Sequence, residues 1–246
     1  MRSVAHMLLA GAALTAAATL TVATSASAQG IGAGEGRPFH AFVLTTGMST
    51  MSVDALNARM APSQFAPLSN DAVSYGAGGY LAIGRALLGA EVARSAFGEE
   101  GLDNGRTDEL SALQGMATVG YAIVSTGRLS LFPQLGVGVG RLDVSLRDRS
   151  GAGTSASQPT FDEVTQSPGA ESRMSGRHLL YSFGGGADYL VSRGGSPVGV
   201  VLGIRAGLLA SPNRTTWTRD GQSIVAGPDA AAGGPYARVV VGVGGR

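Results

Sequence analysis

The sequence has no cysteine, no lysine and few charged residues. Without cysteine, the chain forms neither disulfides nor thiolate metal sites, and it has no cysteine nucleophile. Charged residues make up 14% of the 246 residues, and the formal net charge of +1 gives no argument for nucleic-acid binding. The missing lysine indicates a coding bias, because arginine serves equally well as a surface cation. An apolar content of 44% with so little net charge does not fit a disordered chain.

The first 28 residues are predicted to be a secretory signal peptide. Arg2 precedes an uncharged apolar stretch over residues 4–22, and small residues lead to the expected cleavage site between Ala28 and Gln29. A membrane anchor is the alternative. Residues 29–37 are glycine-rich and are interpreted as a flexible linker, since no strand precedes them to form a phosphate-binding loop. After the signal peptide, the sequence contains no run of about 20 apolar residues, so no membrane-spanning helix is predicted.

Residues 38–246 are predicted to form one all-β domain. Apolar and polar residues alternate with a period of two, which indicates strands, and no helical period persists. The expected strands cover residues 38–52, 73–85, 87–97, 110–125, 128–147, 177–191, 198–210 and 235–245.

The connections between these strands alternate between long and short. In an up-and-down barrel, alternate connections lie at the same end, so the long loops meet at one rim and the short turns at the other. Long outer loops and short periplasmic turns are typical of bacterial outer-membrane barrels. The sequence therefore predicts an eight-stranded antiparallel up-and-down transmembrane β-barrel with four long outer loops and three short periplasmic turns.

One face of most expected strands is aliphatic, and the other is rich in glycine and small polar residues. An eight-stranded interior is just wide enough for side chains to fill, so 39 glycines suit a narrow lumen with an aliphatic exterior. In the strand over 128–147 the alternation changes phase near Gly140, which predicts a β-bulge. Near strand ends the aliphatic face carries the aromatics expected of a membrane girdle, namely Tyr75, Tyr121, Tyr181 and Tyr189.

This pattern resembles the small eight-stranded outer-membrane β-barrels of Gram-negative bacteria, such as the transmembrane domain of outer membrane protein A and the porin-like outer-membrane β-barrel domain. The resemblance covers the whole chain after the signal peptide and rests on strand pattern, not on a sharp motif. It implies insertion into the outer membrane by the barrel-assembly machinery. Such proteins commonly end in an aromatic residue that this machinery reads, whereas this chain ends in Val243, Gly244, Gly245 and Arg246.

Four charged residues are expected to face the lumen in mid-strand, namely Glu91, Asp188, Arg205 and Arg238. Charges in a low-dielectric interior must pair. We therefore predict a closed salt-bridge network that plugs the barrel, with a selectivity constriction or gate as the functional alternative. Arg141 and Asp143 are expected to extend this network toward the outer rim.

No metal site, cofactor or enzymatic activity is predicted. His178 and Ser182 lie four residues apart on one strand face, about 13 Å at ~3.3 Å per residue, which is too far for a base and its nucleophile. A lipid A-modifying enzyme stays an alternative, in which a serine on a neighbouring strand approaches His178. Trp217 is expected to anchor a loop at the outer interface. The loop over residues 149–176 is either an adhesive surface or disordered.

The predicted function is a structural or surface-interaction role in the cell outer membrane, with at most a narrow pore. We expect a monomer that contacts outer-membrane lipid and, during insertion, the assembly machinery. No nucleic-acid partner is expected, and the partner of the long loops is not identified by the sequence. The rival is a soluble exported lipocalin-like barrel that binds a small apolar ligand, which requires Val200 and Leu202 to face inward.

Overall fold

The computed structural model describes residues 39–97, 100–101, 106–126, 128–148, 159–168, 170–192, 196, 198–212 and 215–245. The expected signal peptide, its cleavage site at Ala28 and Gln29, and the linker lie outside these residues. In the described ranges, no helix is long and apolar enough to cross a membrane.

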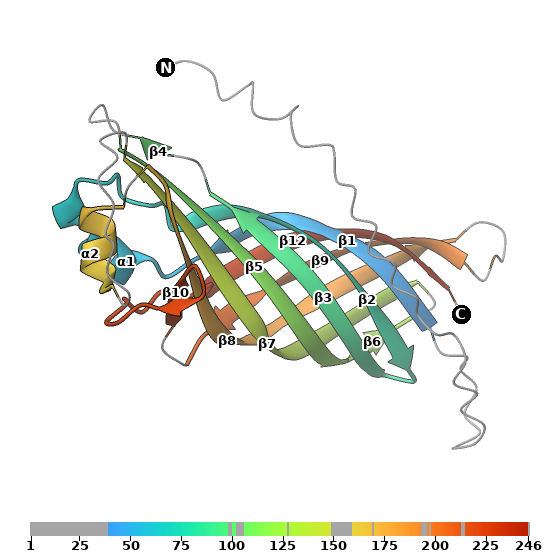
Figure 1. Ribbon diagram of the computed structural model, residues 1–246. Coiled ribbons are helices and arrows are strands. Elements are labelled where there is room, and N and C mark those ends of the chain that lie inside the picture. Colours follow the sequence, from blue (N-terminus) through green and yellow to red (C-terminus); the bar gives the residue numbers. More distant parts are fainter. Residues whose placement is uncertain are drawn as a thin grey trace, which may run out of the picture. The chain divides into compact units, whose positions relative to one another are not determined.

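Eight long strands close into an antiparallel barrel (Figure 1). In chain order they are β1 (Phe39–Thr50), β2 (Asp71–Ile83), β3 (Ala86–Ala96), β5 (Arg106–Tyr121), β7 (Leu129–Asp148), β8 (Ser172–Val191), β9 (Val198–Ala210) and β12 (Gly234–Gly245). Each strand pairs with the next, and β1 pairs with β12 from His40↔Gly245 to Ser49↔Tyr236, which closes the barrel. The predicted closed eight-stranded antiparallel barrel is confirmed. The largest boundary differences are at β5 and β8, which begin at Arg106 and Ser172 instead of residues 110 and 177.

The aliphatic face of the strands points outward. On β9, Val200 and Leu202 are 43% and 44% exposed, whereas Val201 between them is 1% exposed. The same alternation runs through β12, where Val239 and Val241 are exposed and Arg238 is buried. Since side chains of successive strand residues point to opposite faces, the buried set lines the lumen.

The predicted β-bulge near Gly140 is wrong. The ladders pair Gly140 with Gln114 on β5 and with His178 on β8, and both registers are unbroken. The side chains of β7 keep alternating between the two faces without a shift, and what changes at Gly140 is which face carries the apolar residues. Below Gly140 the outward side chains are apolar, as at Val139, whereas beyond it they are polar, as at Arg141. The inner face changes in the opposite sense, from glycine to buried Leu142, Val144 and Leu146.

The inner aliphatic residues of β7 belong to a hydrophobic cap at one end of the barrel (Figure 1). The cap contains the helices α1 (Asp54–Met60), η2 (Ala61–Ser63) and α2 (Phe161–Gln166), and the hairpin of β10 (Thr216–Arg219) with β11 (Gln222–Ser223). Two further short strands, β4 (Glu100–Gly101) and β6 (Val124–Ser125), pair with β5 and β7. The fully buried cap residues include Leu56, Phe161, Val164, Met174 and Trp217.

Trp217 lies inside the cap, so its expected place at the outer membrane interface is wrong. Its side chain is 1% exposed, and its indole Nε1 donates to the Pro228 carbonyl over 2.7 Å. The ring packs edge-on against Phe161, with centroids 5.7 Å apart. The loop folds back over the barrel end because burying this large apolar surface is more favourable than leaving it exposed.

The two cap helices are short and are held by specific polar contacts. Thr160 and Glu163 form a capping box, in which each side chain accepts a hydrogen bond from the other's backbone N–H. Arg59 on α1 and Asp162 on α2 form an ion pair of 2.8 Å. The long connection after the first strand and the segment expected to be an adhesive or disordered loop thus contribute folded, mutually linked helices. Residues 149–158 of the latter lie outside the described ranges.

Candidate functional site in the barrel lumen

Arg205 on β9 and Asp188 on β8 form a buried two-pronged ion pair in the lumen. Nη1–Oδ1 is 2.5 Å and Nη2–Oδ2 is 2.8 Å, and both side chains are less than one-tenth exposed. The Tyr80 hydroxyl on β2 donates to Oδ2 of Asp188 over 2.7 Å. Because β2 and β8 are four neighbours apart in the ring of eight strands, this bond joins opposite walls of the lumen.

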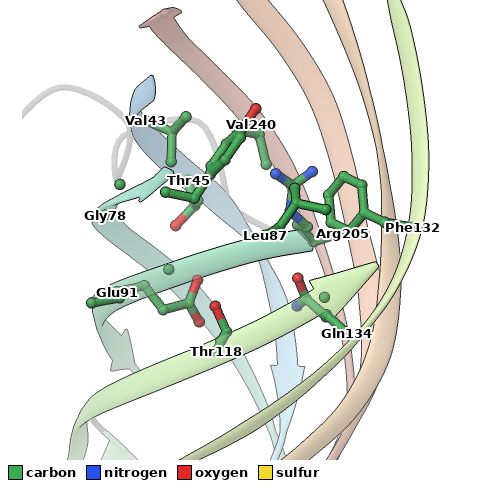
Figure 2. Close-up of a pocket in the computed structure, with 15 residues that line it drawn as sticks. Val43, Thr45, Gly78, Leu87, Glu91, Thr118, Phe132, Gln134, Arg205 and Val240 are labelled. Carbon is green, nitrogen blue, oxygen red and sulfur yellow. The ribbon is translucent and has the colours of Figure 1, made fainter. Parts of the chain in front are cut away.

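An aromatic ring contacts this ion pair, and two glycines leave room for its side chains. The Arg205 guanidinium lies 4.6 Å from the centre of the Phe132 ring, a favourable cation–π contact that Figure 2 shows. A Cβ at Gly203 would collide with Oδ1 of Asp188, and one at Gly186 would stand 2.8 Å from Nη1 of Arg205. Glycine at these two positions lets the paired side chains lie flat against the wall.

Arg238 on β12 and Glu91 on β3 form the second ion pair. Arg238 Nη1 is 2.8 Å from Glu91 Oε1, and the guanidinium lies 5.0 Å from the Tyr236 ring centre. The strands β1 and β2 stand between β12 and β3, so this pair also crosses the lumen. Among the described residues, Nε and Nη2 of Arg238 are buried without a hydrogen-bond partner. Buried polar atoms of this kind are commonly satisfied by water.

The two ion pairs are separate in the described lumen, so the closed four-residue network expected from the sequence is not formed. Glu91 and Arg205 line one cavity of about 40 Å³, together with Thr45, Thr118 and Gln134 (Figure 2). This volume holds only a few water molecules, since one needs roughly 10–15 Å³.

Arg141 and Asp143 do not extend the lumen charges, which corrects a second expectation. Both lie on the outer face of β7, with side chains 48% and 41% exposed, and they pair with each other at 2.8 Å. The Ser175 hydroxyl on β8 also donates to Asp143. Because β7 contains no bulge at Gly140, its odd-numbered positions stay outward along the whole strand.

His178 is buried inside the barrel, on the inner face of β8. It is 5% exposed, and its Nε2 accepts a hydrogen bond from the Ala232 backbone N–H over 3.2 Å. Ser182 lies four residues further along the same buried face, and His40 is exposed on β1. In the described part of the chain, no group of three or more histidine and acidic side chains is placed to hold a metal ion.

The aromatic partners Tyr80 and Phe132 were not among the site residues expected from the sequence. The alternation along each strand could have identified them. Tyr80 shares the inner face of β2 with Gly78, and Phe132 shares the inner face of β7 with Gly136. A large ring on a face otherwise made of glycine marks a place where the ring fills the lumen.

No protein-family model matches the chain, and no curated protein does either. Among solved structures, the chain is similar to Ail, the attachment invasion locus protein of Yersinia pestis, with 13% identity, a TM-score of 0.47, and coverage of 85% of this chain and 99% of Ail. It is similar to a major outer membrane protein from Thermus thermophilus, with 10% identity, a TM-score of 0.45 and coverage of 84% and 98%. It is also similar to Neisserial surface protein A, with 11% identity, a TM-score of 0.41 and coverage of 85% and 95%.

Proposed function

We propose that this protein is an outer-membrane β-barrel with a filled lumen and a structural or surface-interaction role. The observation that carries the proposal is the outward aliphatic belt around a lumen that holds the buried charges. A water-soluble barrel has the reverse arrangement, since exposed contiguous apolar surface of this extent is avoided in soluble monomers. An outer-membrane barrel instead turns its apolar band toward lipid and its polar residues inward.

The height of the belt fits a bilayer. On β8 the outward residues are polar up to Arg177 and then apolar or small from Leu179 to Val191. Twelve residue steps correspond to about 40 Å along the strand at ~3.3 Å per step. At a tilt of about 40°, the belt is about 30 Å high, which matches the hydrocarbon core of a bilayer.

Cysteine labelling tests the direction of the belt. The chain has no native cysteine, so Val200→Cys, Leu202→Cys and Val201→Cys each introduce a single thiol. In reconstituted vesicles, we expect a lipid-soluble maleimide to label positions 200 and 202 and to leave the inward position 201 unlabelled. If a charged, membrane-impermeant maleimide labelled Val200→Cys as fully as the lipid-soluble maleimide does, a membrane position for this face would be contradicted.

The filled lumen predicts a barrel that does not conduct ions. The lumen is crossed by the Arg238–Glu91 pair and the Tyr80–Asp188 hydrogen bond, and the cavity between them is only about 40 Å³. In planar bilayers, we expect the inserted protein to give the same current as a protein-free membrane. Steady channel openings with a fixed conductance would overturn the filled-lumen proposal in favour of the narrow pore.

The lipocalin-like alternative has less support than the membrane barrel. It needs Val200 and Leu202 to face inward, and both face outward. It also needs an interior pocket, typically about 300–1,000 Å³ for a small ligand. A hollow of about 480 Å³ lies at the cap end beside Ser52, Thr215 and Asp229, not in the lumen. A non-enzymatic role is favoured over lipid A modification because His178 is buried with Nε2 engaged by Ala232.

A further inference from the structure

A row of exposed arginines crosses the outer surface at the cap-side edge of the aliphatic belt. Arg94 on β3 pairs in register with Leu113 on β5, Leu113 pairs with Arg141 on β7, and Arg141 pairs with Arg177 on β8. All three arginines belong to the outward face of their strands and are exposed. We call Arg94, Arg141 and Arg177 the arginine row.

The arginine row lies at the boundary between two kinds of surface. The next outward positions toward the belt are Val92, Val139 and Leu179, which are apolar. The next positions toward the cap are Ala96, Asp143 and Ser175. Tyr75 on β2 pairs with Arg94 and continues the row, and tyrosine is enriched at membrane interfaces. The guanidinium groups therefore stand at the depth of lipid headgroups, not in hydrocarbon or in bulk water.

The charges within the row are not balanced by the protein. Arg141 is paired with Asp143, but Arg94 and Arg177 have no ion-pair partner among the described residues. Arg141 and Arg177 are also direct cross-strand neighbours, an arrangement that is unfavourable for like charges. An anion on this surface would remove the repulsion and give Arg177 and Arg94 a partner.

We propose that the arginine row binds the phosphate groups of an anionic glycolipid headgroup in the outer leaflet. This inference rests on the proposed function, because it needs the belt in a membrane and the cap outside. Guanidinium groups bind phosphate through paired N–H donors, and the flanking belt receives the acyl chains. A headgroup with two phosphates matches a row whose two unpaired cations lie on either side of Leu113 and Arg141.

Arg173 provides a matched control on the same face of β8. It lies four residues from Arg177, further into the cap and away from the belt. Its Nε donates to Glu171 over 2.8 Å, and this hydrogen bond lowers the pKa of Glu171 below its usual range. Arg173 is thus an exposed cation of the same chemistry that already has a carboxylate partner and no adjacent apolar surface.

The test measures binding of diphosphorylated lipid A to the purified barrel in detergent micelles by native mass spectrometry. We expect each arginine removed from the row to weaken binding about fivefold, so that the double variant Arg94→Gln/Arg177→Gln loses about 25-fold. Arg173→Gln should bind as the unmodified protein does. Dephosphorylated lipid A should bind weakly and equally to all variants, and excess inorganic phosphate should not displace the diphosphorylated lipid.

Three results would overturn the inference. The first is that the double variant binds lipid A as tightly as the unmodified protein, and the second is that Arg173→Gln loses as much affinity as the double variant. The third is full displacement of the diphosphorylated lipid by inorganic phosphate, which would make the row a site for free anions. The heat-dependent gel mobility of each variant in phosphatidylcholine vesicles reports insertion separately. A protein that inserts but does not select phosphorylated lipid refutes only the arginine row, whereas failure of the unmodified protein to insert refutes the proposed function.

Discussion

Asp188→Ala is expected to destabilise the barrel by about 3–5 kcal/mol, because it leaves the Arg205 guanidinium buried without a counter-charge. The substitution also removes the acceptor of the Tyr80 hydroxyl, so one contact between opposite walls is lost. Arg205 is 8% exposed and lies against Phe132, so most of its surface is shielded from bulk water. The free energy of unfolding in urea, measured in lipid vesicles, gives the size of the effect.

The exposed pair of Arg141 and Asp143 supplies the control for this prediction. Asp143→Ala also breaks an ion pair of 2.8 Å, but on the outer surface, where the expected change is about 0–1 kcal/mol. The double variant Asp188→Leu/Arg205→Met removes both buried charges and should recover much of the lost stability. Equal losses for Asp188→Ala and Asp143→Ala would contradict the burial of the lumen pair.

Trp217→Ala is expected to cost about 3–5 kcal/mol within the cap, because it empties the centre of a fully packed core. The substitution removes the edge-on contact with Phe161 and the hydrogen bond to the Pro228 carbonyl. The barrel strands keep their own ladders, so the loss should be confined to the cap. Hydrogen exchange of the backbone amides should rise in α1, α2 and β10 and stay unchanged in the part of β9 that carries the outward aliphatic residues.

Val225→Ala is the matched control in the same segment, since Val225 is 53% exposed. It removes an aliphatic side chain close to β11 without opening the core, and its expected change is within about 0.5 kcal/mol. If Trp217→Ala raised exchange equally in cap and barrel, the two would unfold as one unit, and the separate stability of the cap would be refuted.

The barrel could be predicted from the sequence because its two faces differ in composition, one being aliphatic and the other rich in glycine and polar residues. Along β9, the even-numbered residues from Val198 to Leu208 face outward as their parity predicts, and the charged Arg205 falls on the inner face. The cap could not be predicted in this way. Its helices have seven and six residues, which is too short for a helical period to emerge, and their buried residues meet partners far away in the sequence.

The error at Gly140 has a specific physical cause. The prediction assumed that apolar residues on a strand always face the same medium. On β7, apolar side chains point outward at Val137 and Val139, and then point inward, into the cap core, at Leu142 and Val144. A strand that runs from the barrel wall into a folded cap exchanges its apolar face without any change in register. Recognising this requires the position at which the cap begins, which lies at Gly140, between the outward Val139 and the inward Leu142.

The bonds across the lumen also constrain the order in which the barrel is built. Glu91 on β3 meets its partner Arg238 only on β12, and Tyr80 on β2 meets Asp188 only on β8. A growing sheet of the first strands alone would hold Glu91 without its cation. Asp188 and Arg205 already meet on the adjacent strands β8 and β9, whereas Glu91 is neutralised only when β12, the last strand, joins the sheet. Ring closure and the pairing of Glu91 with Arg238 therefore become one cooperative step. An open, partly assembled sheet is disfavoured by the same side chains that stabilise the finished ring.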